Sequence, residues 1–384
     1  MSSTHRSTRT LAMGALALGL AMTTAIPVAI AASPDSADNT VATGLNNPRG
    51  LSFSPDGSLY VAEAGLGGDG PCIEGGEGVA CLGSTGSVTK LMKKSGVQSR
   101  VLIGLPSLAG PGGFAATGPS DVSAQTFDRL AVAMGLGGDP ADRDTLGEAG
   151  ALLGTLVTSK GGAAPAMVAD LAAYENDANP HQGPADPEDP RKWFDSNPTS
   201  VIRQGNRYIA TDAGGNDLLQ TVGDKVSTLA VFGDQWVQAP PLVGDFKIPM
   251  QSVPTAVAKG PNGAYFVSEL TGFPFAPGSA RIWMVRKGQT PTVYATGLTN
   301  VTDLAWSGKQ LYAVQLSDVG LLNEPPEGLP TGSLRAITPG ATQHAAVVDG
   351  LTAPYGVAIR QGTAYVTTCA MCPGFGEVNT FELP

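Results

Sequence analysis

A pair of short apolar strands joined by a turn recurs six times along the 384-residue chain. In five of these repeats the first strand begins at a proline, and in the fifth repeat along the chain it begins at Val301. The first opening reads Pro48-Arg49-Gly50-Leu51 and its return reads Leu59-Tyr60-Val61-Ala62. The other openings lie near residues 119, 198, 254, 301 and 354. A unit that recurs at this scale is typical of a propeller or a solenoid, in which no single repeat can bury its faces alone.

Two further strands complete each repeat, with the period-two alternation or β-branched content of a half-buried pleat. The predicted third strands are residues 87–91, 152–157, 218–222, 281–285, 333–337 and 377–381. The predicted outer strands are residues 99–102, 167–170, 226–230, 292–295 and 345–348. The last repeat has no outer strand of its own, because the sequence stops at Pro384.

The missing strand is found near the start of the chain. Residues 39–45 match residues 292–298 in pattern and in their position ahead of a repeat. The sequence therefore predicts an all-β, six-bladed β-propeller in which the N-terminal strand completes the last blade. Such closure removes exposed strand edges, and an open solenoid would have no use for a displaced half-repeat.

The first residues resemble an export signal. Arg6 and Arg9 precede an apolar stretch over residues 11–30, and Ala29-Ile30-Ala31 fits a signal-peptidase site. An uncleaved membrane anchor is the alternative, although Thr23, Thr24 and Pro27 interrupt the apolar stretch. We expect a signal peptide at 1–31, a short linker at 32–38, and one propeller at 39–384 in a secreted, extracytoplasmic protein without stable membrane insertion.

Net charge narrows the set of partners. The formal charge of −10 becomes −12 when the signal peptide takes Arg6 and Arg9 with it, since no acid lies in residues 1–31. Binding to polyanions depends on basic residues that displace counterions from phosphates. We therefore expect no nucleic-acid partner, and a small molecule or another protein instead.

Four cysteines fall in two close pairs, Cys72/Cys81 and Cys369/Cys372. In an exported chain an even number of cysteines predicts two disulfides. Local pairing within each pair is one scheme. Cross-blade pairing is the other, because the two pairs lie in the first and last repeats, which become neighbours in a closed ring. A redox or zinc half-site at Cys369-Ala-Met-Cys372 is a third interpretation, although zinc needs two more ligands.

The repeats are longer than ordinary blades because of inserts at residues 66–84, 135–150, 175–196, 270–280 and 316–331. Four of these five inserts follow a second strand, so they should gather on one face of the propeller. Loops held in place by a rigid scaffold commonly carry function. The sequence therefore places a binding or catalytic site on this face.

Acidic side chains occur at related positions in the repeats. Glu63, Asp212 and Glu269 come at or just past second strands, and Asp121 and Asp303 lie near the start of first strands, which line a propeller axis. Carboxylates packed together raise one another's pKa unless a cation lies among them, and calcium takes six to eight oxygen ligands. These five residues are predicted metal ligands, with calcium as the one cofactor considered. The alternative is that each acid caps a turn.

The sequence gives little support for other catalytic or nucleotide-binding sites. The sequence has three histidines and no G-x-S-x-G, H-E-x-x-H or Walker A segment. Residues 65–70 match the dinucleotide pattern G-x-G-x-x-G, but Pro71 and further glycines follow in place of a helix. This segment is therefore interpreted as a loop.

Several segments together resemble the ScyD/ScyE family of exported bacterial proteins, which are similar to NHL-type propellers. The matching text includes Gly44-Leu45-Asn46-Asn47-Pro48-Arg49-Gly50-Leu51, Asp212-Ala213-Gly214-Gly215-Asn216-Asp217 and Glu269-Leu270-Thr271-Gly272-Phe273-Pro274. The family name comes from gene clusters for a cyanobacterial sunscreen pigment. The resemblance implies an exported propeller and supplies no established catalytic residues.

The sequence favours a binding or scaffold protein that uses its loop-rich, acidic face, with no chemistry of its own. The alternative is a calcium-dependent hydrolase or lactonase of the propeller type, with the five acids as ligands. A lyase of the streptogramin-inactivating type is a third hypothesis, which the shortage of histidine disfavours.

Overall fold

A computed structural model describes residues 39–75, 78–93, 95–126, 129–182, 194–326 and 328–384. The predicted signal peptide (1–31) and linker (32–38) lie outside the described residues. The described chain forms one compact unit, Asn39–Pro384. None of the helices found in the described residues combines the length and the apolar character needed to cross a membrane.

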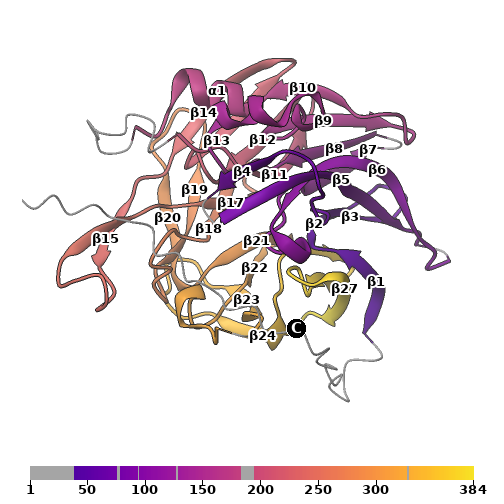
Figure 1. The fold of residues 1–384 in the computed structure, drawn as a ribbon. Helices are drawn as coiled ribbons and strands as arrows, with labels where there is room; N and C mark the ends of the chain where they lie inside the picture. Colours follow the sequence, from indigo (N-terminus) through magenta and orange to yellow (C-terminus); the bar gives the residue numbers. More distant parts are fainter. Residues whose placement is uncertain (1–38, 76–77, 94, 127–128, 183–193, 327) are drawn as a thin grey trace, which may run out of the picture. The chain divides into compact units, whose positions relative to one another are not determined.

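Six antiparallel sheets, five of four strands and one of five, follow one another around a common axis (Figure 1). Blade 1 contains β2 (Pro48–Phe53), β3 (Leu59–Glu63), β5 (Gly78–Leu91) and β6 (Gln98–Ala109), and a short β4 (Cys72–Gly75) pairs with β5. Blade 2 contains β7 (Pro119–Thr126), β8 (Arg129–Met134), β9 (Thr155–Lys160) and β10 (Ala166–Asp170). Blade 3 contains β11 (Pro198–Gln204), β12 (Arg207–Asp212), β13 (Asp217–Val222) and β14 (Lys225–Val231).

The second half of the chain repeats this order. Blade 4 contains β17 (Pro254–Lys259), β18 (Tyr265–Glu269), β19 (Ala280–Val285) and β20 (Thr292–Leu298). Blade 5 contains β21 (Val301–Ser307), β22 (Gln310–Gln315), β23 (Thr331–Ile337) and β24 (Ala345–Thr352). Blade 6 contains β25 (Val357–Arg360), β26 (Thr363–Thr368) and β27 (Pro373–Glu382), with β1 (Thr40–Asn46) as its fourth strand.

The ring closes where the two ends of the described chain share a sheet. Strand β1 pairs antiparallel with β27, with Ala42 opposite Val378 and Thr40 opposite Asn379. The Thr40 hydroxyl also donates a hydrogen bond to Asn379 Oδ1 at 2.6 Å. The prediction of a six-bladed propeller closed by its N-terminal strand is confirmed.

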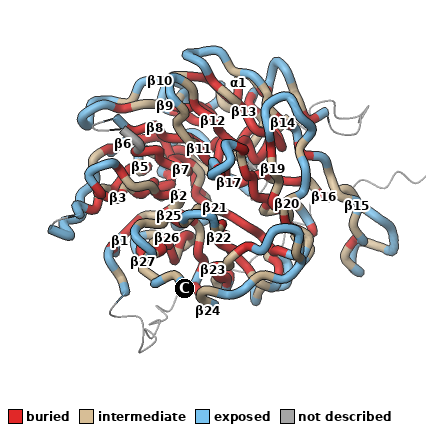
Figure 2. Tube along the Cα trace, turned by 180° about the vertical axis from the view of Figure 1, so that it is seen from behind, coloured by how far each residue is buried: buried red, intermediate tan, exposed pale blue. Residues whose placement is uncertain are grey.

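The core lies between neighbouring blades, because each sheet must bury two faces. Between blades 1 and 2, Val88, Val132 and Val157 are fully buried in one cluster. Val61 of blade 1 is also fully buried, but it packs in a different cluster, between blades 1 and 6. Burying a valine side chain contributes about 1.5–3 kcal/mol. Figure 2 shows the same pattern throughout, with buried residues concentrated in the inner strands and exposed residues along outer strands and loops.

The inserts contain structure of their own. The insert after β8 forms the 3-10 helices η2 (Pro140–Leu146) and η3 (Glu148–Gly150), and the one after β22 contains η4 (Leu321–Asn323). A further turn, η1 (Pro111–Gly113), follows β6. The insert that begins at residue 175 is partly helical, since α1 (Leu171–Ala178) ends within it. This helix is capped at its start by Asp170. Residues 183–193 of that insert lie outside the described residues.

One element has no counterpart in the sequence-based prediction. Strands β15 (Gln235–Gln238) and β16 (Lys247–Met250) form a two-stranded hairpin between blades 3 and 4. It extends away from the body of the propeller in Figure 1. Trp236 lies in β15 and is exposed.

Candidate functional site

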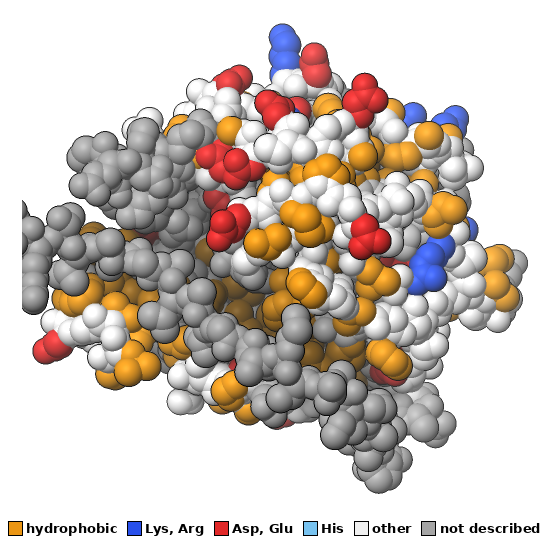
Figure 3. All heavy atoms as spheres, in the orientation of Figure 1, with side chains coloured by type: hydrophobic (Ala, Val, Ile, Leu, Met, Phe, Trp, Pro, Cys, Tyr) orange, Lys and Arg blue, Asp and Glu red, His pale blue; other side chains and the backbone are white. Residues whose placement is uncertain are grey.

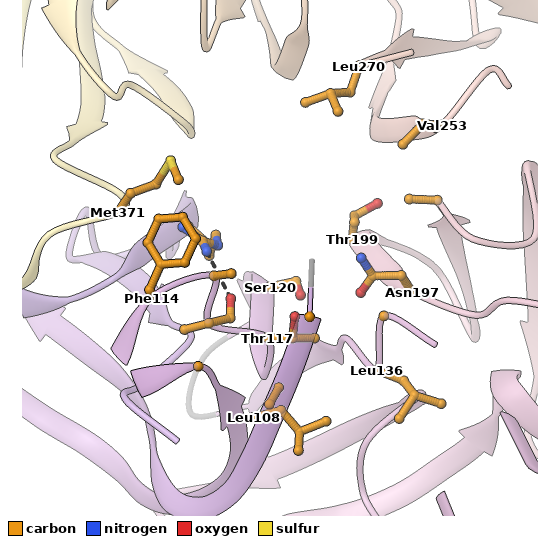
Figure 4. Close-up of a pocket in the computed structure, with 18 of the residues that line it drawn as sticks. Leu108, Phe114, Thr117, Ser120, Leu136, Asn197, Thr199, Val253, Leu270 and Met371 are labelled. Carbon is orange, nitrogen blue, oxygen red and sulfur yellow. Dashed lines mark hydrogen bonds between the residues drawn. The ribbon is translucent and has the colours of Figure 1, made fainter. Parts of the chain in front are cut away.

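A cavity of about 540 Å³ lies where the first strands of the blades begin (Figure 4). Every blade contributes to it, through Arg49 of blade 1, Ser120 of blade 2, Thr199 of blade 3, Thr255 of blade 4, Leu316 after blade 5's second strand, and Tyr355 of blade 6. Its volume falls within the range of about 300–1,000 Å³ that is typical of small-molecule sites. This cavity is the candidate functional site.

The repeat itself places one side chain per blade at the cavity. Arg49, Ser120, Thr199, Thr255 and Tyr355 each come directly after the proline that opens a repeat. The proline fixes the backbone at the start of the strand, so the following residue takes the same place in each blade. Ser120, Thr199, Thr255 and Tyr355 were not predicted as site residues, although their shared position after proline was a usable signal.

The inserts form the apolar wall of the cavity. Each of the five predicted inserts supplies lining residues: Ile73, Leu136, Asp195, Leu270 and Leu316 are one from each. In Figure 4, Phe114 and Met371 lie together on one side, with Leu136 and Leu270 on other sides. The prediction that the inserts lie around one site therefore agrees with the lining of the cavity.

The wall is less acidic than we expected. Among the described residues that line the cavity, only Arg49 and Asp195 are charged, and none of the five predicted metal ligands is present. Figure 3 shows hydrophobic side chains gathered near the middle of this view, with acidic side chains spaced apart around them. The cavity therefore suits a largely apolar ligand better than a highly charged one.

Arg49 is held rigidly at the wall. Its Nη2 donates to the Ala116 carbonyl oxygen at 2.9 Å and its Nη1 donates to the Ala370 carbonyl oxygen. The guanidinium also lies 4.8 Å from the centre of the Tyr355 ring, an arrangement that stabilises a cation over an aromatic face. Its positive charge thus has a fixed position beside the cavity.

Both disulfides lie in segments that line this cavity. Cys72 pairs with Cys81 across β4 and β5, and Cys369 pairs with Cys372. The local pairing is confirmed, and the cross-blade alternative is wrong. The second disulfide encloses Ala370 and Met371. The Ala370 carbonyl oxygen accepts the hydrogen bond from Arg49, and Met371 lines the cavity.

Three predicted metal ligands hold strands together. Glu63, at the end of β3, accepts hydrogen bonds from the Asn46 backbone N–H at 2.7 Å and from Ser87 Oγ at 2.9 Å. It also forms an ion pair with Arg100 at 2.7 Å. These contacts join the end of blade 6's outer strand to blade 1, as expected of a residue that caps a turn.

Glu269 and Asp212 occupy the same place in blades 4 and 3. Glu269 accepts from both Nε and Nη2 of Arg281, from Trp283 Nε1 at 2.7 Å and from Ser252 Oγ at 2.7 Å. Asp212 accepts from the Asn197 backbone N–H at 2.6 Å and from Ser196 Oγ at 2.6 Å. Burial raises the pKa of Asp212, and these hydrogen bonds lower it.

Asp121 and Asp303 are brought near each other, close to the axis. Asp121 accepts from the Val122 and Val201 N–H groups at 2.7 and 2.9 Å, which ties blade 2 to blade 3. Asp303 accepts from the Leu304 and Val357 N–H groups, both at 2.7 Å, which ties blade 5 to blade 6. Desolvation raises the pKa of Asp121 to about 7. It raises the pKa of Asp303 well above its ordinary value, with a further contribution from the charge of Asp121.

The five predicted ligands therefore do not meet at one point. In the part of the chain that the structure describes, no three histidine, cysteine or acidic side chains are already grouped in a way that could hold a metal ion. The structure brings Asp121 and Asp303 together and places Glu63, Asp212 and Glu269 in separate blades. The acidic residue at the cavity is Asp195, whose pKa is raised to about 7 by burial and then by the charges of Asp212 and Asp139.

A scan against protein-family models and a search of curated proteins found no match. Solved structures of six-bladed propeller proteins are similar to the chain in arrangement. A gluconolactonase from Xanthomonas campestris has a TM-score of 0.49 at 10% identity, covering 90% of this chain and 89% of that chain. The PQQ-bound aldose sugar dehydrogenase from Streptomyces coelicolor has a TM-score of 0.46 at 13% identity, covering 89% and 96%.

A chain of the nidogen/laminin complex has a TM-score of 0.44 at 12% identity, covering 78% of this chain and 92% of that chain. The similar structures thus include enzymes and a chain of a protein–protein complex. At these TM-scores and identities, the likenesses carry no activity to this chain.

Proposed function

We propose that the chain is a secreted, ScyD/ScyE-like propeller that binds a small, largely apolar ligand in its axial cavity. The observation that carries the proposal is the cavity itself, which every blade lines and which combines an apolar wall with one fixed cation, Arg49. Such a mixture of apolar surface and a few placed polar groups is typical of small-molecule sites. Two local disulfides support export, because disulfides persist in oxidising compartments.

The ligand that suits this cavity is an aromatic or polycyclic molecule with an acidic or carbonyl oxygen. Leu108, Leu136 and Leu270 offer apolar contacts for the rings. Arg49 offers a positive charge for the oxygen, and the hydroxyls of Ser120 and Thr117 add polar contacts beside it. Binding without chemistry is favoured over hydrolysis because the charged groups at the described wall are one arginine and one aspartate, and not a pair of acids or a histidine with its partner.

The fluorescent dye 1-anilinonaphthalene-8-sulfonate tests this proposal, because it joins apolar rings to an anionic group. We expect saturable binding to the folded protein, with one dye per chain. Replacing Leu270 by tryptophan fills part of the cavity and should weaken binding, whereas Val293→Trp, on the exposed outer strand β20 of the same blade, should not. Both variants need unchanged thermal unfolding, since partly unfolded chains also bind this dye.

Equal dye binding by the wild-type protein and Leu270→Trp would show that the dye does not occupy the cavity, and would contradict the proposal. Native mass spectrometry of protein purified from its own source then identifies the natural occupant. A bound mass that disappears in Leu270→Trp and persists in Val293→Trp is the expected result.

A further inference from the structure

The side of the propeller opposite the axial cavity is formed by short turns. In each blade the first strand begins at the cavity, so the turn to the second strand lies on the other side, as does the turn from the third strand to the fourth. In blade 3 these two turns are residues 205–206 and 223–224. In blades 5 and 6 the first turns are residues 308–309 and 361–362. The long inserts lie on the cavity side instead.

Exposed lysine and arginine side chains gather at these turns, which we call the basic face. Five of the six blades supply at least one of them: Lys93 in blade 1, Arg129 and Lys160 in blade 2, Lys225 in blade 3, Lys259, Arg286 and Lys287 in blade 4, and Lys309 in blade 5. Apart from Arg129, none of these side chains forms an ion pair with another described residue. Their charges are therefore available to a partner.

The positive charge continues across the junction between blades 6 and 1. A Cβ atom built on Gly57, in the first turn of blade 1, would lie 2.6 Å from Lys93 Cδ and 2.9 Å from Arg360 Nη2. Arg360 ends the first strand of blade 6 and is half-buried, with its guanidinium 5.4 Å from the centre of the Phe53 ring. All six blades therefore contribute a cation to this side.

Acidic side chains are sparse on the basic face. The exposed acids that the structure describes at these turns are Asp56, Asp224 and Glu382, and the last residue, Pro384, follows close behind Glu382. Asp56 already accepts hydrogen bonds from the Ser54 hydroxyl and the Ser58 N–H group. By sequence, the residues of these turns outside the described part, 94 and 127–128, add one lysine and one aspartate. The basic face therefore keeps an excess of positive charge.

The cavity side has the opposite character. Exposed acids occur in its inserts and in the β15–β16 hairpin, at Asp69, Glu74, Asp144, Glu148, Asp177 and Asp245. Lys247 is an exposed lysine on the same hairpin. Figure 3 shows acidic side chains spread over the face in view, with lysine and arginine side chains mostly near its edges. The negative net charge of the chain is thus distributed unevenly between the two sides.

The negative net charge does not cancel the attraction between the basic face and an anionic surface. A strand of six residues spans about 20 Å, which separates the two sides of the propeller. The Debye length at physiological ionic strength is about 8 Å. Acids on the cavity side are therefore largely screened from a surface in contact with the basic face, and the local charge decides the interaction.

We propose that the basic face binds the surface of an anionic phospholipid membrane, with the axial cavity turned away from the lipid. Cations distributed over six blades match headgroups that are spread over a plane. A linear polyanion instead needs a groove of cations that follows its backbone. The interaction is separate from ligand binding in the cavity, and it keeps the cavity open to the surrounding solution.

Exposed apolar side chains among the cations support a lipid partner. Met92 and Val97, in the turn between β5 and β6, are 43% and 52% exposed, and Val222, at the end of β13, is 41% exposed. The Met92 N–H group donates a hydrogen bond to the Val97 carbonyl oxygen, which closes the turn and holds the two side chains at its base. Apolar side chains beside lysine and arginine are typical of segments that lie in the membrane interface.

The first test sediments the mature protein with phosphatidylcholine vesicles that contain or lack phosphatidylglycerol. We expect binding to the anionic vesicles, little binding to phosphatidylcholine alone, and a steep loss between about 50 mM and 200 mM salt. A lysine close to an anionic surface contributes about fivefold in affinity. The combined variant Lys225→Gln, Lys287→Gln and Lys309→Gln should therefore bind about 100-fold more weakly. Lys247→Gln, the matched control on the cavity side, should bind like wild type.

The second test determines which side touches the lipid. Brominated phosphatidylglycerol quenches the fluorescence of tryptophans that lie against the bilayer. Met92→Trp places a tryptophan on the basic face, and Val243→Trp places one at an equally exposed position of the hairpin on the cavity side. We expect the added fluorescence of Met92→Trp to be quenched and that of Val243→Trp to be retained.

The proposal is overturned if the protein does not sediment with anionic vesicles at low salt, or if the combined lysine variant binds as well as wild type. Quenching of Val243→Trp in place of Met92→Trp would show that the other side faces the lipid. Binding to double-stranded DNA or heparin without binding to vesicles would assign the basic face to a soluble polyanion. Dye binding in the axial cavity is measured without vesicles, so the two proposals can fail independently.

Discussion

The guanidinium of Arg49 hydrogen-bonds the carbonyl oxygen of Ala370, a residue enclosed by the Cys369–Cys372 disulfide. Arg49 belongs to the first blade and Ala370 to the last, so this contact spans the junction at which the ring closes. The fixed cation of the cavity is thus held by both ends of the propeller.

Removing the charge of Arg49 should weaken binding of anionic ligands. We expect Arg49→Met to lower affinity for the anionic dye about 10- to 100-fold, since a hydrogen bond to a charged group contributes about 1.5–3 kcal/mol. Affinity for a neutral apolar dye should change much less. Fluorescence titration of both dyes measures the difference, with Lys225→Met on the exposed strand β14 as the charge-matched control. An equal loss for the two dyes would show that Arg49 acts through packing alone.

The ion pair of Glu269 with Arg281 should be important for stability. Glu269 is completely buried, and Glu269→Ala leaves Trp283 Nε1 without its acceptor and Arg281 without its ion-pair partner, with the Gly233 carbonyl oxygen as its remaining acceptor. Breaking a buried pair in this way costs about 3–5 kcal/mol. Asp349 also pairs with an arginine, Arg335 at 2.8 Å, but its side chain is 62% exposed. Asp349→Ala should therefore cost less than about 1 kcal/mol. Urea unfolding compares the two, and similar costs would contradict the assigned role of Glu269.

The two acids near the axis predict a loss of stability as the pH rises. The folded state raises the pKa of Asp121 to about 7, whereas an aspartate in an unfolded chain titrates near about 3.9. Between these values the folded state holds a proton that the unfolded state has lost. The free energy of unfolding therefore falls by up to about 1.4 kcal/mol per pH unit for this group and levels off above its folded pKa.

Urea unfolding in EDTA at several pH values between about 5 and 8 measures this slope. Asp303, whose pKa is raised well above its ordinary value, extends the trend to higher pH. Asp121→Asn should reduce the slope by about one proton. A wild-type stability that increases over this range would contradict the assignment.

Ring closure by β1 predicts a strong effect at one residue of that strand. Leu45 is fully buried between blades 6 and 1, packed in the cluster that contains Leu51 and Val61. Leu45→Ala should destabilise the protein by about 2–5 kcal/mol because it leaves a cavity in that contact. Val41 lies on the exposed side of the same strand, so Val41→Ala should have a small effect. Thermal unfolding distinguishes the two, and equal effects would indicate that β1 does not complete the blade.

The arrangement of strands could be read from the sequence because it follows from local patterns. Strand β1 was predicted from its likeness to residues 292–298. The cysteine count predicted two disulfides but left local and cross-blade pairing open. The β15–β16 hairpin was missed because its sequence, with Pro240 and Pro241 at the turn, lacks the alternation that marked the other strands. The positions of the inserts around the cavity followed from where they interrupt the repeats.

The chemistry of the site was harder to predict. Ser120, Thr199 and Thr255 look like turn residues in the sequence, and only their shared place after a proline relates them to the cavity. Glu63 and Glu269 were predicted as metal ligands, and in the structure they pair with Arg100 of β6 and Arg281 of β19. The partners of a buried carboxylate are set by three-dimensional contacts, which sequence spacing does not encode.

The sharing of one sheet by β1 and β27 also sets the order of events during folding. A ribosome delivers residue 40 long before residue 379, so the first strand has to wait for its neighbour until almost the whole polypeptide has been made. Contacts between such distant parts of a chain form slowly. Until the final strand arrives, the edges of the first and last blades stay open to other chains, which makes chaperones and low protein concentration important for production.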